Sequence, residues 1–212
     1  MSAWDEAYKK GEFAKTEPLP EVVEFAEMLK KDKLKRVLDL GCGRGRHAKY
    51  LASLGFVVSA CDISEEALKA AKELCKDACE FKKCDMGNLA YGDSSFDAVI
   101  SNNVLQHGRI SEIRIAIAEI SRVLRKGGLL LVTIASVAHD DCGKGTEIEK
   151  GTWIDNQQNK ADGKVPHHYF SEEEMKKEFS GFSILKLWQQ KRESDLGAGR
   201  VSASWAMIAK RA

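Results

Sequence analysis

Hydrophobic and polar residues follow two different patterns in the first half of the chain. Short, mostly apolar runs have the length of buried strands, and the stretch between two of them places Ala67, Leu68, Ala71 and Leu74 on one helix face. Ser64, followed by two glutamates, is a typical N-cap with acidic residues in the first turn. The expected elements are strands at residues 36–40, 56–61 and 79–84 and helices at residues 46–53 and 65–76. This order predicts parallel strands, because a crossover through a helix joins strands that run the same way.

The second half of the chain repeats this pattern and then departs from it. The expected elements are strands at residues 96–101, 127–133, 182–189 and 201–209 and helices at residues 111–125 and 171–179. Gly127 and Gly128 make a turn into a strand, and Ser171 with Glu174 makes a capping box. The connection between the last two strands is too short for a helix, so they pair as a hairpin. The prediction is an α/β fold: a single-domain, Rossmann-like, doubly wound sheet of seven strands, mostly parallel with a C-terminal antiparallel hairpin.

Two segments lie outside this predicted core, and both are expected to act as lids. The N-terminal segment, residues 1–33, carries Trp4 and Tyr8 ahead of an amphipathic helix. The insertion at residues 136–169 follows the fifth strand, where loops at the carboxyl edge of a parallel sheet face the ligand crevice. Loops of this length are usually functional or disordered, and the apolar residues in this one favour a lid that packs. The aromatic residues of both lids are therefore expected to meet over the carboxyl edge of the sheet.

A short apolar strand runs directly into three glycines at alternate positions, Gly41, Gly43 and Gly45. Glycine allows a sharp turn and a close approach of a ligand, and the helix that follows directs free N–H groups at that ligand. Asp62 lies 21 residues after Gly41, close to where an acid that binds ribose hydroxyls is expected. The dinucleotide fingerprint requires a third small residue where this chain has Arg46, so a nucleotide cofactor other than NAD is favoured.

Four segments in the first two thirds of the chain resemble the motifs of one family. The run VLDLGCGRGRHAKYLA at residues 37–52 resembles the first motif of the class I S-adenosylmethionine-dependent methyltransferases. Residues 61–64 resemble the acidic ribose motif, residues 84–86 the adenine-contacting motif, and residues 95–107 the strand and loop beside the transferred methyl group. The motifs appear in the family's order, and the family's sheet also ends in an antiparallel hairpin.

The resemblance implies a cofactor and the residues that hold it. S-adenosyl-L-methionine is the implied cofactor, and S-adenosyl-L-homocysteine is the product. The implied cofactor-binding residues are Asp39, Gly41, Cys42, Gly43, Gly45, Asp62, Ile63, Asp85, Met86, Asn102 and Asn103.

Several of these residues also have an ordinary structural interpretation. Asp39 would face the cofactor's ammonium group or the loop amides, or it caps a turn. Asp62 would bind the ribose hydroxyls, or it serves the N-terminus of the following helix. Asp85 and Met86 would frame the adenine, or they end a strand and fill the core. The two asparagines would lie near the methionine portion of the cofactor, or they belong only to the loop.

Three residues are candidate catalytic groups: His107, Tyr8 and His168. His107 closes the loop beside the transferred methyl group and could accept a proton from an acceptor, although a structural histidine is an equal alternative. His167 and His168 are adjacent in an extended stretch and point to opposite sides, so at most one faces a ligand. Tyr8 and Trp4 could close over the cofactor and present aromatic faces to its sulfonium cation, or Trp4 packs as a hydrophobic staple.

Composition and charge limit the expected partners. The chain has 33 basic and 32 acidic residues, interspersed, with a formal net charge of +1, which gives no reason to expect nucleic acid. Its apolar runs are shorter than the ~18 residues of a membrane span, and the N-terminus is charged, so a cytoplasmic protein without a membrane partner is expected. The six cysteines fit reduced thiols, and their spacing lacks the C-x-x-C pairs of zinc sites, so no metal is expected.

These observations predict a methyltransferase that forms one domain over residues 1–212 and transfers a methyl group to a small-molecule acceptor by in-line displacement. The absence of a recognisable RNA-binding extension favours a small acceptor. A long lid favours catalysis over simple binding, because a closable crevice serves a second ligand. The alternatives are methylation of tRNA or protein, and a non-catalytic S-adenosylmethionine-binding module. A monomer or a homodimer fits the sequence equally.

Overall fold

The computed structural model of the protein describes residues 3–11, 13, 15–155, 165–193 and 201–212. The helices are α1 (Ala3–Lys9), α2 (Pro20–Lys31), α3 (Arg46–Ser53), α4 (Glu65–Cys75), the 3₁₀ helix η1 (Lys76–Ala78), α5 (Ile110–Val123) and α6 (Glu172–Glu178). The strands are β1 (Arg36–Leu40), β2 (Val57–Asp62), β3 (Cys79–Lys83), β4 (Phe96–Asn102), β5 (Leu124–Ala135), β6 (Thr146–Glu149), β7 (Thr152–Ile154), β8 (His167–His168), β9 (Phe182–Glu193) and β10 (Val201–Arg211).

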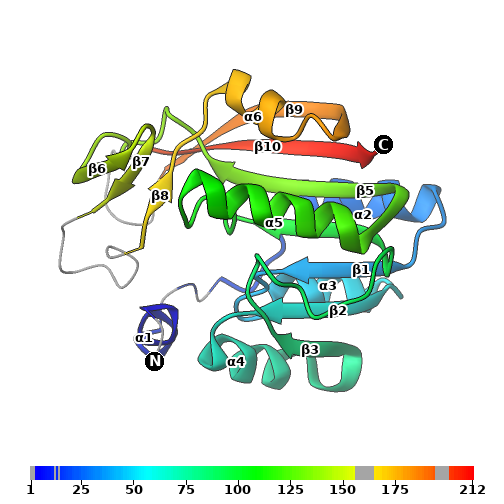
Figure 1. The fold of residues 1–212 in the computed structure, drawn as a ribbon. Helices are drawn as coiled ribbons and strands as arrows, with labels where there is room; N and C mark the ends of the chain where they lie inside the picture. Colours follow the sequence, from blue (N-terminus) through cyan, green and yellow to red (C-terminus); the bar gives the residue numbers. More distant parts are fainter. Residues whose placement is uncertain (1–2, 12, 14, 156–164, 194–200) are drawn as a thin grey trace.

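Seven strands form the main sheet in the order β3-β2-β1-β4-β5-β10-β9 (Figure 1). The pairs β1–β2, β1–β4, β2–β3 and β4–β5 are parallel. β10 is antiparallel to both of its neighbours, β5 and β9. The predicted sheet of seven strands, mostly parallel with a C-terminal antiparallel pair, is confirmed. Strand order reverses between β1 and β4, which places a topological switch point at their carboxyl ends, where ligands bind in such sheets.

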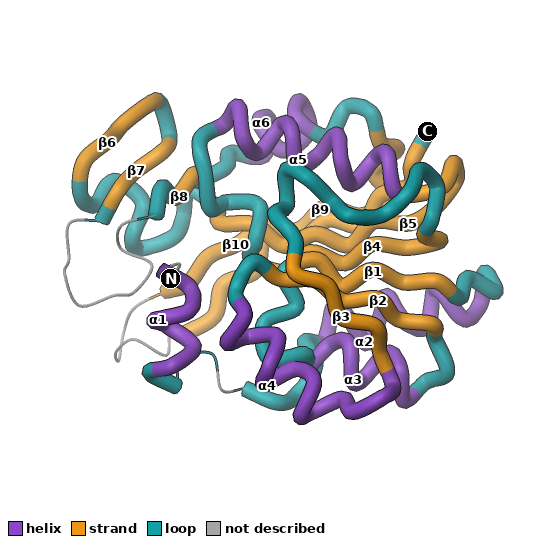
Figure 2. The backbone as a smooth tube through the Cα atoms, turned by 60° about the horizontal axis from the view of Figure 1, so that its bottom comes forward, coloured by secondary structure: helices purple, strands orange, loops and turns teal. Residues whose placement is uncertain are grey.

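Helices cover both faces of the sheet (Figure 2). On one face, Phe25 of α2 and Leu51 of α3 are fully buried in a cluster shared with α4. On the other face, Ile120 of α5 and Met175 of α6 are fully buried in a second cluster. The sheet is therefore doubly wound, as the pattern of the sequence predicts. None of the helices in the described ranges has both the length and the apolar character that crossing a membrane requires.

Two predicted helix caps are formed by serine hydroxyl groups. The Ser64 Oγ accepts a hydrogen bond of 3.2 Å from the Ala67 N–H at the start of α4. The Ser171 Oγ accepts one of 3.2 Å from the Glu174 N–H at the start of α6. Each cap satisfies an amide that has no partner within its helix, which explains why both helices begin where the sequence indicates.

The junction between α5 and β5 differs from the prediction. The helix was expected to reach residue 125, but it ends at Val123, and β5 begins at once with Leu124, which pairs with Phe96. The register then shifts, so Gly127, with its positive φ of 70°, lies inside β5 rather than ahead of it. The final strands β9 and β10 are also longer than predicted, because their pairing extends from Arg211 and Phe182 to Val201 and Glu193.

Both predicted lid segments contain regular structure that the sequence did not reveal. The N-terminal segment begins with α1, which packs against α4. The insertion contains the small sheet β6-β7-β8, whose strands are antiparallel. In Figure 1 the carboxyl ends of β1, β2 and β5 point to the left, towards the side on which α1 and this small sheet lie. The two segments therefore flank the edge of the sheet where a ligand crevice is expected.

Candidate functional site

The glycine loop between β1 and α3 needs residues without side chains at two points. Gly41 has a φ of +68°, and a Cβ there would lie 2.2 Å from a methyl carbon of Val104. Gly43 has a φ of +53°, and a Cβ there would lie 2.7 Å from the Tyr8 hydroxyl oxygen. The first contact joins the loop to the segment after β4, and the second joins it to α1. Any side chain at either glycine would separate these elements, so the loop is packed closely from two directions.

Asp62, at the end of β2, holds the glycine loop through its carboxylate. One oxygen accepts a hydrogen bond of 2.9 Å from the Gly43 N–H, and the other accepts one of 2.9 Å from the Ser64 N–H. Burial raises the pKa of Asp62, and the backbone amides oppose that shift. Carboxylate oxygens have two lone pairs each, so Asp62 can still accept hydrogen bonds from a ligand's hydroxyl groups. The side chain is thus a support for the loop as well as a candidate ribose acceptor.

Asp39, the other acid of the site, is buried at the end of β1. Burial raises its pKa to about 7, a hydrogen bond from the Ala48 amide opposes the shift, and the neighbouring Asp62 adds to it. Its Oδ2 is buried and has no hydrogen-bond partner among the residues that the structure describes. A buried carboxylate oxygen without a donor is costly, and a nearby cation would stabilise its ionised form. Asp39 could therefore hold the ammonium group of a bound cofactor.

The remaining candidate cofactor residues lie on the loops that follow β2, β3 and β4. Ile63 is an exposed apolar side chain directly after Asp62, and Met86 is half-buried against the core. The exposed Asp85 carboxylate accepts a hydrogen bond of 2.7 Å from the Gly87 N–H, so it forms part of its own turn.

Asn102, the last residue of β4, and Asn103, the next residue, are held by Thr133 on β5. The Thr133 hydroxyl donates to the Asn102 Oδ1 at 2.7 Å, and the Asn103 N–H donates to the Thr133 carbonyl oxygen at 3.0 Å. Asn103 is exposed and has a φ of +53°, a conformation that residues other than glycine seldom adopt. This conformation turns the chain into the loop that contacts Gly41, so the segment after β4 adjoins the glycine loop.

Aromatic rings from three distant segments form a row beside this loop, which we call the stack, with neighbouring rings tilted by 50° to each other. The ring centroids of Trp4 in α1 and His107 lie 4.5 Å apart, and those of His107 and His167 in β8 lie 4.6 Å apart. The backbones of His107 and His167 also form an antiparallel bridge. The Nδ1 of His167 lies 2.8 Å from the carbonyl oxygen of Val165, which fixes a neutral His167 as the tautomer with its lone pair on Nε2. The two lids therefore meet through a residue of neither, because Trp4 of one lid and His167 of the other each contact the His107 ring.

Tyr8 lies one helical turn after Trp4 and covers the glycine loop. Its backbone carbonyl accepts a hydrogen bond of 2.8 Å from the Arg44 guanidinium, which also lies 5.6 Å from the centre of the Tyr8 ring. Burial raises the pKa of the Tyr8 hydroxyl far above its usual range, and the Asp62 carboxylate adds to this shift. The hydroxyl therefore stays protonated and can donate a hydrogen bond, but it cannot act as a base at neutral pH.

His168 is the one predicted catalytic residue that the structure does not bring to this site. It is almost completely buried, with its Nδ1 2.7 Å from the Thr152 hydroxyl and its Nε2 3.2 Å from a Glu174 carboxylate oxygen. The alternation of an extended strand turns it away from the side that His167 occupies. His168 therefore connects the small sheet to α6, and its ring does not join the stack of Trp4, His107 and His167.

Sequence reasoning missed the contact that fixes α1 in place. The Asp5 carboxylate accepts a hydrogen bond of 2.7 Å from the Ser64 hydroxyl, the same group that caps α4. The two residues are 59 positions apart, so no local pattern could have indicated the pair. His167 could have been identified from the sequence, because the alternation rule already required that only one of the two adjacent histidines face a ligand.

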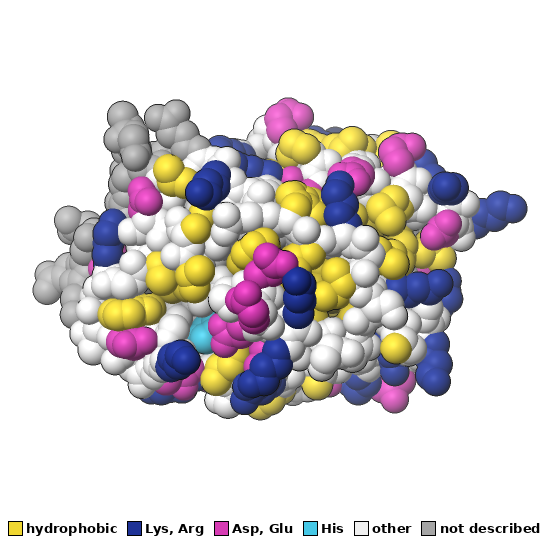
Figure 3. All heavy atoms as spheres, turned by 90° about the horizontal axis from the view of Figure 1, so that it is seen from above, with side chains coloured by type: hydrophobic (Ala, Val, Ile, Leu, Met, Phe, Trp, Pro, Cys, Tyr) yellow, Lys and Arg dark blue, Asp and Glu magenta, His cyan; other side chains and the backbone are white. Residues whose placement is uncertain are grey.

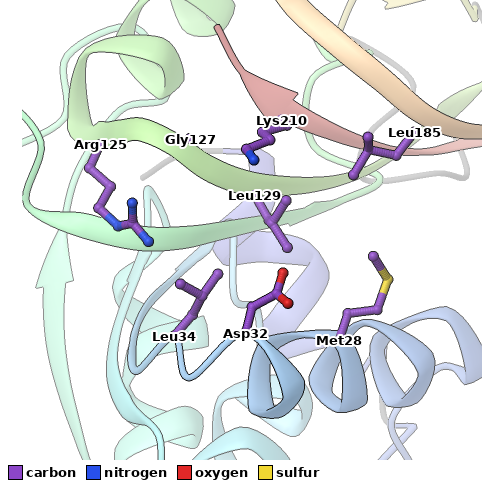
Figure 4. Close-up of a pocket in the computed structure, with 8 residues that line it drawn as sticks. All are labelled: Met28, Asp32, Leu34, Arg125, Gly127, Leu129, Leu185 and Lys210. Carbon is purple, nitrogen blue, oxygen red and sulfur yellow. The ribbon is translucent and has the colours of Figure 1, made fainter.

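A cavity of about 370 Å³ lies elsewhere, at the opposite edge of the sheet (Figure 4). Leu34 and Leu129 line it together with the charged side chains of Asp32, Arg125 and Lys210. These residues precede β1, lie near the start of β5 or end β10, so the cavity is at the amino ends of the parallel strands. Ligands of open α/β sheets bind at the carboxyl ends, which separates this cavity from the candidate site.

The chain matches known methyltransferases in sequence. Residues 38–132 match the family model described as a methyltransferase domain. The chain is 35% identical over 116 residues to a probable tRNA methyltransferase 9B from Mus musculus, a match that covers 54% of this chain and 24% of that protein. The chain therefore spans about a quarter of the length of this curated relative.

Solved structures with the same fold cover almost the whole chain. A S-adenosylmethionine-dependent methyltransferase from Methanosarcina mazei superposes with a TM-score of 0.75 at 22% identity, covering 92% of this chain and 98% of that one. The 1,6-didemethyltoxoflavin-N1-methyltransferase from Burkholderia thailandensis, solved with 1,6-didemethyltoxoflavin and S-adenosylhomocysteine, has a TM-score of 0.70 at 20% identity, with coverage of 97% and 84%. At these identities the likeness shows a shared fold.

Proposed function

We propose that this chain is a class I S-adenosylmethionine-dependent methyltransferase that transfers a methyl group from S-adenosylmethionine to a small-molecule acceptor by in-line displacement. The observation that carries the proposal is that one helix, α1, contacts both the glycine loop and the ring stack. Tyr8 covers the glycine loop, and Trp4, one turn earlier, begins the stack with His107 and His167. One turn of helix rises ~5.4 Å, so a cofactor on the loop and an acceptor at the stack would be neighbours.

The residues at the loop fit this cofactor. The Asp39 oxygen that lacks a donor in the described chain suits an ammonium group, Asp62 suits ribose hydroxyls, and Gly43 lets the Tyr8 hydroxyl approach the loop backbone closely. When bound, S-adenosylmethionine supplies a methyl group already activated by a positively charged sulfur. Ile63, Asp85, Met86, Asn102 and Asn103 are proposed to complete the cofactor site, together with Cys42 of the loop.

The protein's contribution to such a reaction is positioning and exclusion of water. Holding two reacting atoms in line at ~3–3.5 Å can account for roughly 7–11 kcal/mol of the barrier. The stacked rings, fixed by α1 on one side and by β8 on the other, would orient a flat or apolar acceptor. A base is needed only when the methyl acceptor must lose a proton, and His107 or His167 would take up that proton. Tyr8 is proposed to orient the site through its hydroxyl group, since it remains protonated.

A small acceptor is favoured over tRNA by the enclosure and by the charge of the molecule. α1 and the small sheet flank the carboxyl edge, which limits access for a large substrate. Both acidic and basic side chains occur on the described part of the face in Figure 3, and the net charge is +1, so the chain as a whole has almost no excess of cations to favour a phosphate backbone. tRNA methylation is the second candidate, because the chain is 34–35% identical over 116 residues to proteins named as probable tRNA methyltransferases.

The proposal is tested by binding and turnover. Calorimetry with S-adenosylhomocysteine should show binding at one site, and a methyl-release screen over thiols, phenols, amines and oxyanions should find an acceptor. A parallel assay uses unmodified tRNA as the methyl acceptor. Turnover with tRNA alone would replace the small-molecule proposal, and binding without turnover in either arm would favour the non-catalytic module.

Cofactor affinity is expected to fall with acid because of Asp39. Burial raises its pKa to about 7 in the ligand-free protein, whereas a bound ammonium group favours the ionised carboxylate. Binding below that pKa therefore requires loss of a proton. Between pH 8 and pH 6 the dissociation constant of S-adenosylhomocysteine should rise by up to about tenfold, the factor for one pH unit below the pKa. Calorimetry in two buffers of different ionisation enthalpy should detect proton release at pH 6.

The Asp39→Asn variant provides the control for this pH effect. It should bind the ligand weakly and with little dependence on pH. Its ligand-free form should melt at a higher temperature than wild type at pH 8, because a raised carboxyl pKa makes the protein less stable as pH rises from ~4 towards 7. An unchanged pH profile in the variant would show that Asp39 does not contact the cation.

Phenylalanine at either stacked histidine is expected to separate catalysis from cofactor binding. His107→Phe and His167→Phe both keep an aromatic ring in the stack but remove the nitrogens. With an acceptor of high pKa, loss of the base should lower kcat by roughly a hundredfold or more, whereas the affinity for S-adenosylhomocysteine should stay within about twofold. The variant with the larger loss of kcat identifies which histidine acts as the base. Full kcat in both variants with such an acceptor would remove histidine from the mechanism.

A further inference from the structure

Two cysteines lie against the end of the glycine loop. Cys75 is the last residue of α4 and Cys79 is the first residue of β3, and the 3₁₀ turn η1 separates them. The chain reverses sharply at Lys76, which has a φ of +52°. Both side chains lie on the α3 side of this turn, because each thiol hydrogen-bonds to a carbonyl group of that helix or its N-cap.

Both sulfur atoms face the first turn of α3. The Cys75 thiol donates a hydrogen bond of 3.5 Å to the carbonyl oxygen of Gly45, and the Cys79 thiol donates one of 3.6 Å to that of Ala48. These two carbonyl groups belong to residues three positions apart, so both sulfur atoms lie against one turn of α3, and each thiol affects the pKa of the other. A Cβ on Gly45 would lie 3.2 Å from the Cys75 sulfur. The two thiols therefore occupy one place against the end of the glycine loop.

A second pair of neighbouring cysteines shows what distinguishes the first. Cys61 and Cys84 are also in side-chain contact, but both are buried in the core on the opposite face of the sheet. Cys79 is only partly buried, so a small reagent can reach its sulfur, whereas Cys75 beside it is buried. The interaction between the two thiols lowers the pKa of Cys75 and raises that of Cys79. The first pair therefore combines one accessible sulfur with a neighbour whose thiolate form is favoured.

We propose that Cys75 and Cys79 are a site of reversible oxidation by a hydroperoxide, and that their disulfide weakens binding at the glycine loop. The Cys75 thiolate attacks the peroxide oxygen, the O–O bond breaks, and an alcohol or water leaves after protonation. The resulting sulfenic acid is attacked by the Cys79 sulfur, an S–S bond forms, and water leaves. The two thiols lose two electrons in total, and the peroxide gains them.

The disulfide would affect the glycine loop because, in the reduced protein, both thiols hydrogen-bond to the first turn of α3, which follows the loop. An S–S bond of ~2.05 Å draws the sulfurs together and removes both S–H donors. The carbonyl groups of Gly45 and Ala48 then lose their thiol partners at the N-terminus of α3, the turn that carries the loop amides. The effect on cofactor binding rests on the proposed function, whereas formation of the disulfide does not.

The disulfide between Cys75 and Cys79 can be detected directly from the masses of tryptic peptides. Trypsin cuts after Lys72, Lys76 and Lys82, so the two cysteines fall in separate peptides, residues 73–76 and 77–82. After brief treatment of the reduced protein with hydrogen peroxide, we expect these peptides to be linked, with a mass two hydrogen atoms below their sum. Cys75→Ser and Cys79→Ser should abolish the link, and Cys142→Ser, a control at a distant cysteine, should retain it. Absence of the link in both wild type and Cys142→Ser would overturn the proposal.

Cofactor binding completes the test. Oxidised wild type should bind S-adenosylhomocysteine about tenfold more weakly than reduced protein, a difference of ~1.4 kcal/mol, and dithiothreitol should restore the affinity. Peroxide should have no such effect on Cys79→Ser. A linked protein with unchanged affinity would overturn the coupling to the loop. Failure of the reduced protein to bind the ligand would count against the proposed function instead, and the peptide link would still report on the thiols.

Discussion

Asp62→Ala is expected to weaken the binding of S-adenosylhomocysteine by about a hundredfold and to destabilise the protein as well. The ribose interaction alone accounts for ~1.5–3 kcal/mol, or roughly ten- to a hundredfold. In addition, the carboxylate accepts from the Gly43 and Ser64 amides, and each buried amide left without a partner costs ~1–3 kcal/mol. Chemical denaturation should therefore show a free energy of unfolding ~2–6 kcal/mol below that of wild type, and calorimetry should show the loss of binding.

Two further variants separate the loss of binding from the loss of stability. Asp62→Asn keeps one oxygen that can accept from a loop amide, so it should be more stable than the alanine variant while binding the ligand weakly. Asp77→Ala removes an exposed carboxylate from η1 and should match wild type in both measurements. If the folded Asp62→Ala protein bound the ligand as tightly as wild type, the acid would have a purely structural role.

The sequence predicted the core of this fold well because its signals are local. The glycine loop, the Ser64 cap and the Ser171 cap each depend on residues within a few positions of one another, and each lies where it was expected. Parallel pairing followed from the helical crossovers, and the hairpin from a short connection. The boundary at Leu124 was missed because a strand residue pairs before the glycine turn, and that pairing depends on Phe96 in another strand.

The candidate site was predicted less completely, because its contacts join segments far apart in the chain. The motifs identified Asp62, but they did not reveal that both of its oxygens hold backbone amides. The helix α1 is only seven residues long, and its position depends on Asp5, Tyr8 and Trp4 touching three other elements. Local propensity cannot supply such information, since short helices owe most of their stability to packing. The same limit applied to the buried His168, whose partners lie in β7 and α6.

Deleting residues 1–13 is expected to leave the sheet folded and to reduce turnover more than any single substitution in the lid. α1 contributes no strand to the sheet, yet Ala7 is fully buried and Arg44 of the glycine loop donates to the Tyr8 carbonyl. Without α1, water reaches the loop, and the His107 ring loses its Trp4 neighbour. Because closure both positions substrates and excludes water, kcat should fall by roughly a hundredfold or more, and cofactor affinity by about tenfold.

Single substitutions and proteolysis identify which part of α1 is responsible. Tyr8→Phe removes only the hydroxyl over Gly43 and should mainly weaken cofactor binding, whereas Trp4→Ala disrupts the ring stack and should mainly raise the KM for the acceptor. Limited proteolysis should cut α1 more slowly when cofactor product and acceptor are both present than with cofactor product alone, since lids become ordered on binding. If the truncated protein turned over every accepted substrate at the full-length rate, α1 would have no part in the acceptor site, and the small sheet β6-β7-β8 with His167 would have to form that site without it.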